Sequence, residues 1–158
     1  MGEMSRADLV SLARSVAGEL EIEGRLEVRE ESFEQAPFGE FAHSEVRVSS
    51  SAPGSCPVVL ALFEEEDAAG SVTISFGGSY HEVWSLPRDQ TLAVAREFLV
   101  ALMQGNYVEW RRDDGGGEPD VYGLLTAGDG TVLYSDFGRV SADSLEKRGY
   151  LRKTYRHY

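Results

Sequence analysis

The sequence contains one cysteine, Cys56, among 158 residues. A lone thiol cannot form an internal disulfide, and it excludes a zinc site built from four thiolates. Long apolar runs are also missing, because no stretch approaches the ~20 residues of a membrane span. The first residues, Met1-Gly-Glu-Met-Ser5, lack the basic and apolar regions of a signal peptide. We therefore expect a cytoplasmic protein with no membrane partner.

Basic residues are scarce, since 15 Lys and Arg stand against 27 Asp and Glu and give a net charge of -12. The charge is uneven: residues 1–67 carry 15 acidic and 5 basic side chains, whereas residues 139–158 carry 2 acidic and 6 basic ones. An acidic surface repels nucleic acid and can steer a basic partner, although acidity can equally serve solubility alone. The basic, tyrosine-rich tail 149–158 could bind single-stranded nucleic acid. We expect it instead to be mobile, or to pair with the protein's own carboxylates.

The central part of the chain has the clearest pattern. Apolar and polar residues alternate in Ser71–Phe76, which predicts a strand, and Gly77-Gly78 predicts a bend before a second strand over 79–85. In that second strand, Tyr80, Glu82 and Trp84 share one face, and His81 and Val83 share the other. A helix is predicted to follow, capped by Asp89 and running to Met103, and then a strand over 107–110.

The flanking segments complete the expected fold. Ser5 and Asp8 have the form of a capping box for a helix ending near Gly24, and strands are expected near residues 26–28, 40–48 and 57–63. Ala127-Gly-Asp-Gly130 predicts a hairpin turn, and 142–148 a short helix. The runs of strands favour an α+β class over a parallel nucleotide-binding fold. We expect a single domain over 1–158, with a mainly antiparallel sheet of about six to eight strands and two principal helices packed on one face.

Candidate catalytic groups are few and poorly spaced. His81 and Glu82 should point to opposite faces of a strand, and Ser85 stands where a helical zinc motif needs its second histidine. Cys56 precedes an apolar strand, where a small buried thiol is ordinary. Neither Gly77-Gly78 nor Gly115-Gly-Gly117 continues as a phosphate-binding loop. We therefore expect no catalytic residue, cofactor or metal, with His43 and His81 as possible functional histidines.

The central part of the chain also resembles a known group of protein families. The stretch Ser75-Phe-Gly-Gly-Ser-Tyr-His-Glu-Val-Trp84, the helix after it and Tyr107-Val-Glu-Trp110 together resemble immunity proteins of bacterial polymorphic toxin systems. In some of those families a strand ends in Phe-Gly-aromatic-His-x-His, and Val83 stands here in place of the second histidine. The resemblance implies a protein without enzymatic activity that binds one toxin and masks its active site.

Charge and aromatic residues favour a partner-binding surface independently of that resemblance. A toxin inhibitor needs an acidic face to compete for a basic groove, and a basic nuclease is a candidate partner. Phe41, His43, Glu45 and Arg47 should share one strand face. The residues expected to bind the partner are Glu45, Glu64, Glu65, Glu66, Asp67, Tyr80, Glu82 and Trp84.

Three other interpretations of the sequence remain open. Tyr80 and Trp84 could be core residues, because large aromatic side chains dominate cores as well as interfaces. The chain could be a small-molecule-binding or hydrolytic domain that uses His43 and His81. It could also be a domain that dimerises through its outer strands.

Overall fold

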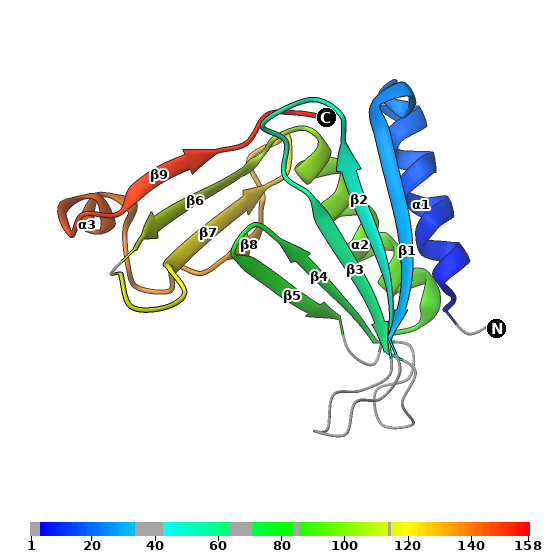
Figure 1. Ribbon diagram of the computed structural model, residues 1–158, viewed down its shortest axis with the longest axis horizontal. Helices are drawn as coiled ribbons and strands as arrows, with labels where there is room; N and C mark the ends of the chain where they lie inside the picture. The colour runs from blue at the N-terminus through cyan, green and yellow to red at the C-terminus, as the bar shows by residue number, and fades with distance from the viewer. Residues whose placement is uncertain (1–3, 34–42, 64–70, 84–85, 114) are drawn as a thin grey trace.

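The computed structural model describes residues 4–33, 43–63, 71–83, 86–113 and 115–158. These residues form helices, a short 3-10 turn (η1) and strands in two sheets (Figure 1). The elements in chain order are α1 (Arg6–Glu19), η1 (Glu23–Arg25), β1 (Leu26–Phe33), β2 (His43–Ser50), β3 (Val58–Phe63), β4 (Val72–Phe76), β5 (Ser79–Val83), α2 (Arg88–Met103), β6 (Tyr107–Arg112), β7 (Asp120–Thr126), β8 (Val132–Ser135), α3 (Ala142–Lys147) and β9 (Leu151–Thr154).

The first sheet is a meander with the order β1-β2-β3-β4-β5, and the second has the order β8-β7-β6-β9. Every paired strand in both sheets is antiparallel. The α+β class and the antiparallel pairing are therefore confirmed. The strands are divided between two sheets, however, where one sheet of six to eight was expected. Periodicity identifies a strand but not the strand it pairs with, and β6 pairs with β7 and β9 instead of extending the first sheet.

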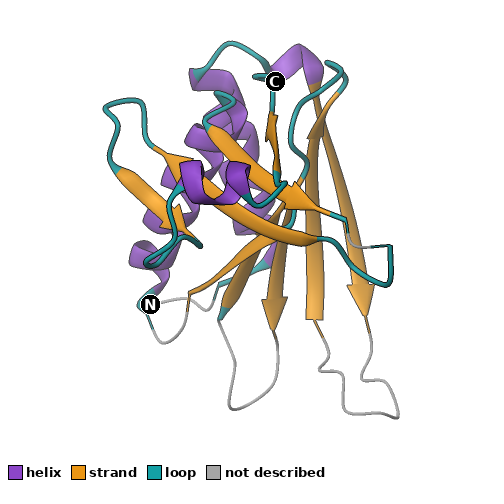
Figure 2. Ribbon diagram, turned by 90° about the vertical axis from the view of Figure 1, so that its left-hand side faces the viewer, coloured by secondary structure: helices purple, strands orange, loops and turns teal. Residues whose placement is uncertain are grey.

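The two long helices pack on one face of the first sheet, and α2 lies behind its strands in Figure 1. The third helix, α3, covers the second sheet instead, and it lies nearest the viewer in Figure 2. Two cores result. The main core lies between the helices and the first sheet, and a smaller one is centred on Trp110, Leu145 and Tyr150.

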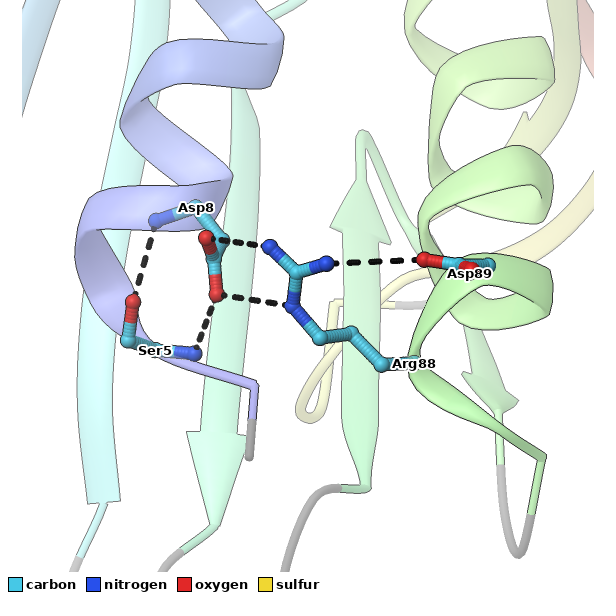
Figure 3. A network of polar contacts seen from close by, with 4 residues as sticks. All are labelled: Ser5, Asp8, Arg88 and Asp89. Carbon is cyan, nitrogen blue, oxygen red and sulfur yellow. Dashed lines mark hydrogen bonds and ion pairs between the residues drawn. The ribbon is translucent and has the colours of Figure 1, made fainter. Parts of the chain in front are cut away.

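The N-terminal ends of α1 and α2 are joined by an ion pair (Figure 3). The predicted capping box is confirmed, since Ser5 Oγ accepts from the Asp8 backbone N–H and the Asp8 carboxylate accepts from the Ser5 N–H at 2.9 Å. That carboxylate also accepts two hydrogen bonds from the Arg88 guanidinium, from Nη2 at 2.7 Å and from Nε at 3.3 Å. One side chain therefore caps α1 and holds the first residue of α2.

The predicted cap of α2 is wrong. The N-cap is Pro87, no side chain caps the helix there, and Asp89 lies in the first turn. Its carboxylate is 93% exposed and 3.4 Å from Arg88 Nη1. Pro87 has φ -55° and ψ 151°, so it lies just outside the helix, which begins at Arg88, two residues earlier than an N-cap at Asp89 would require.

The tail expected to be mobile is part of the fold. Residues 151–154 form β9, which pairs with β6, and Tyr150 and Tyr158 are buried. The Tyr158 backbone N–H donates to the carbonyl oxygen of Met103 at 2.9 Å. The basic residues of the segment are typical of a solvated tail. Its tyrosines, however, anchor it, because Tyr158 belongs to the main core and Tyr150 to the smaller one.

Candidate functional site

One face of the first sheet is not covered by any helix of the described residues. Strand alternation directs Val46, Leu60 and Ile74 into the core under α1 and α2, and it directs their neighbours outward. We call the outward side the open face. Its described residues include Glu27, Arg29, Glu31, Phe33, His43, Glu45, Arg47, Ser49, Val59, Ala61, Phe63, Thr73, Ser75, Tyr80 and Glu82.

The register arranges most of this face in three rows that run across the strands, and the pair Glu27 and Ser49 lies beyond the third. The first row carries aromatic rings and consists of Phe33, His43 and Phe63. The second row includes three carboxylates and consists of Glu31, Glu45, Ala61, Thr73 and Glu82. The third row begins with two guanidinium groups and consists of Arg29, Arg47, Val59, Ser75 and Tyr80.

Contacts between the rings make the first row a continuous stack. The His43 ring lies between Phe33 and Phe63, with centroid distances of 4.8 and 5.3 Å. Phe33 is 37% exposed, so the end of the stack reaches solvent. Such a stack gives the face a rigid apolar element that a partner could cover.

Glu45 connects the three rows. Its carboxylate lies 3.2 Å from His43 Nε2 and accepts from Arg47 at 3.1 and 3.2 Å. The side chain is only 16% exposed. Ion pairs along the sheet therefore hold the middle of the face in one arrangement before any partner binds.

The structure places several predicted site residues on this face. Glu45, Tyr80 and Glu82 lie on it, and Tyr80 is 60% exposed, so the alternative that Tyr80 belongs to the core is wrong. The predicted sharing of a face by His43, Glu45 and Arg47 is confirmed. Outside the described residues lie Phe41, Glu64, Glu65, Glu66, Asp67 and Trp84.

The two histidines do not form one site. His43 belongs to the open face, whereas His81 lies on the helix side of the sheet. Its ring stacks on the ring of Phe98 in α2, with a centroid distance of 4.9 Å. Cys56 is fully buried, and burial raises the pKa of its thiol to about 12. A hydrolytic centre that uses both histidines therefore has no geometric basis, and the thiol has the character of a core side chain.

Sequence reasoning missed Arg29, Glu31, Phe33 and Phe63. The signal for the first three was their spacing at every second residue of β1, which places them together on one face. Which face this is, however, depends on the pairing of β1 with β2.

A second missed feature is a buried polar network between the sheets. The Glu109 carboxylate is fully buried and accepts from the Gly78 N–H at 3.1 Å, the Tyr107 hydroxyl at 3.0 Å and the Tyr155 hydroxyl at 2.8 Å. The Tyr107 hydroxyl also lies 2.8 Å from Ser79 Oγ. Burial raises the pKa of both tyrosines. These groups are satisfied by one another, which fits a structural role at the junction of the sheets.

Asp136 extends this network on its other side. Its carboxylate accepts from the Gly123 N–H at 2.9 Å, from Ser79 Oγ at 3.0 Å and from the Tyr134 hydroxyl. Burial and the nearby carboxylate raise the pKa of Tyr134 to about 12. Two carboxylates thus fix the turn between β4 and β5 against the second sheet.

Over the described ranges, no group of three or more His, Cys, Asp or Glu side chains could hold a metal ion. In the same part of the chain, no helix is long and apolar enough to cross a membrane.

Comparison with protein-family models, with curated proteins and with solved structures gave no match.

Proposed function

We propose that the protein is a partner-binding inhibitor, an immunity protein that neutralises a cognate bacterial toxin by masking its active site. The proposed binding surface is the open face. The observation that carries the proposal is the arrangement of aromatic, acidic and basic rows on the face of the sheet opposite to the face on which α1 and α2 pack.

The aromatic groups supply anchors for a protein partner. Binding energy at protein interfaces concentrates in a few aromatic and arginine side chains that become fully desolvated. Tyr80 and the Phe33–His43–Phe63 stack have the required chemistry and exposure at two sides of the face. The ion pairs of Glu45 reduce the conformational entropy that a partner would otherwise have to remove.

Charge selects the class of partner. A net charge of -12 accelerates encounter with a basic protein, and the effect weakens as salt screens the attraction. The open face carries four glutamates, Glu27, Glu31, Glu45 and Glu82, against two arginines among its described residues, so the surface retains an acidic excess. A basic nuclease is the toxin class that this charge suits best.

The test is co-purification with the product of the gene immediately upstream, followed by titration calorimetry at low and moderate salt. We expect a one-to-one complex whose affinity falls as salt rises, together with loss of the toxin's activity at equimolar inhibitor. Tyr80→Ala should weaken the complex by about tenfold or more, as truncation of an interface anchor does.

A matched pair of charge reversals locates the interface. Glu82→Lys changes the open face, and Glu97→Lys makes the same change on the exposed side of α2, which packs against the opposite face. We expect a large loss of affinity only for Glu82→Lys. Equal losses for the two variants would place the binding surface elsewhere, and absence of any complex would overturn the proposed function.

A further inference from the structure

A cleft lies where the open face meets the second sheet. It encloses about 550 Å³ and is lined by side chains of β2, β3 and β4 on one wall and of β6 and β9 on the other. Gly54, Ser55, Pro57 and Gly77 also line it. This volume falls in the range of sites for small molecules.

The cleft is basic although the protein is strongly acidic. Arg47, Arg111 and Lys153 reach it from three strands that are far apart in the sequence, and no Asp or Glu is among the described residues that line it. Lys153 has no carboxylate within 4.0 Å in the described part of the chain, and its ammonium lies 4.8 Å from the centre of the Tyr155 ring. Arg47 and Arg111 contact carboxylates outside the lining, chiefly Glu45 and Glu109, so with Lys153 the lining keeps an excess of positive charge, which favours an anion.

Carboxylates behind the lining hold the cationic groups in place. Glu109, fully buried, lies 3.5 Å from Arg111 Nη1 and accepts from the Tyr155 hydroxyl at 2.8 Å. Glu45 holds Arg47 through two N–H donors. Both guanidinium groups are therefore partly ordered before an anion arrives, which lowers the entropic cost of binding it.

We propose that this cleft binds a phosphate group, either as free phosphate or as part of a phosphorylated small molecule. Guanidinium groups present paired N–H donors that match phosphate oxygens, and an ammonium adds a compact point charge. The hydroxyl groups of Ser75 and Thr154 add neutral donors at the wall. The inference does not depend on the proposed toxin partner, because it concerns the protein alone.

The test is titration calorimetry of the whole protein with phosphate, pyrophosphate, AMP and adenosine, at constant ionic strength. We expect saturable one-to-one binding of at least one phosphate-bearing probe and none of adenosine. Equal affinity for phosphate and AMP would identify a free anion as the ligand, whereas tighter binding of AMP would identify a phosphorylated small molecule.

The two lysines of the chain provide a matched control. Lys153→Glu places a negative charge at the cleft, and Lys147→Glu makes the same change on the exposed side of α3. We expect affinity to fall by about tenfold or more only for Lys153→Glu, as for loss of a charge-assisted contact. The proposal is overturned if no phosphate-bearing probe binds, or if both variants bind equally weakly. If Lys153→Glu weakens only a complex with a protein partner, the cleft receives an acidic protein segment and the phosphate assignment is wrong.

Discussion

The hydroxyl group of Tyr158 lies 2.7 Å from the carbonyl oxygen of Cys56 and 3.1 Å from that of Val48. The phenol is fully buried, and burial raises its pKa. Both carbonyl groups belong to residues of the main core, Val48 within β2 and Cys56 just before β3. This contact joins the basic C-terminal segment to the sheet that carries the open face.

Tyr158→Phe removes the only donor that this side chain offers to the two carbonyl groups. We expect the free energy of unfolding to fall by about 1–2 kcal/mol, because a buried acceptor is left without its partner. Urea unfolding followed by tryptophan fluorescence measures the change. Tyr80→Phe, on an exposed tyrosine, is the control and should change stability by less than about 0.5 kcal/mol. Equal effects of the two changes would mean that the Tyr158 hydroxyl contributes nothing.

Gly123 permits the close contact between the two sheets. A Cβ atom at this position would overlap Ser79 Oγ and lie 2.7 Å from the Tyr107 hydroxyl oxygen. We expect Gly123→Ala to reduce the free energy of unfolding by about 1–3 kcal/mol, since the buried network must shift to accommodate the methyl group. Thermal and urea unfolding measure the loss.

Gly128 supplies the control for that prediction. An added Cβ there would meet nothing closer than 3.9 Å, so Gly128→Ala should be close to neutral. A Gly123→Ala protein as stable as Gly128→Ala would show that the sheets are not fixed through this contact.

Local patterns in the sequence predicted local structure well. The Ser5 capping box, the alternation of β2 and β4 and the turn at 127–130 depend on neighbouring residues, and the structure has all three. The prediction that Asp89 caps α2 was wrong because Pro87 is the N-cap residue. The sequence pattern alone does not decide which of two nearby residues takes that position.

Long-range pairing could not be read from the pattern. Glu109 carries a charge and would be expected at the surface, yet it is buried because Tyr155 and the Gly78 N–H, distant in sequence, satisfy its oxygens. The rows of the open face depend in the same way on the register of five strands. The sequence indicated the chemistry of Glu45, Tyr80 and Glu82, but not that Phe33 and Phe63 stack around His43.

Acid should weaken the junction between α1 and α2. Hydrogen bonds from Arg88 first, and from the Ser5 backbone next, lower the pKa of Asp8 from 3.8 to about 2. A carboxylate whose pKa is lowered by folding stabilises the fold above its unfolded pKa, and this contribution is lost as the pH falls toward about 2. We expect Asp8→Asn to cost about 1 kcal/mol near neutral pH, the usual value of a helix cap, and much less near pH 2.

Asp89→Asn is the matched control for Asp8→Asn, because Asp89 also contacts Arg88 but is 93% exposed. Its effect on the free energy of unfolding should be small at every pH. Urea unfolding of both variants over the acid range measures the difference. Parallel curves for Asp8→Asn and the unmodified protein would show that Asp8 does not carry the acid sensitivity.

His81 should make stability depend on pH in a different range. Its ring stacks on the ring of Phe98 and makes a T-shaped contact with the ring of Tyr134, with a centroid distance of 6.3 Å. Burial lowers the pKa of His81, and the charge of neighbouring Glu82 opposes this effect. The unfolded chain therefore binds a proton more readily than the folded chain. Stability is highest above the ordinary histidine pKa of 6.5 and declines as the pH falls through the folded value.

Replacing His81 by glutamine removes the titrating group, so the decline in the free energy of unfolding between about pH 7.5 and 5.5 should become shallower. His157→Gln makes the same replacement at an exposed histidine and should leave the slope unchanged. Urea unfolding at several pH values gives the slopes of all three proteins. An unchanged slope in His81→Gln would mean that the ring protonates without loss of its packing against Phe98, and that the helix side of β5 tolerates a charge.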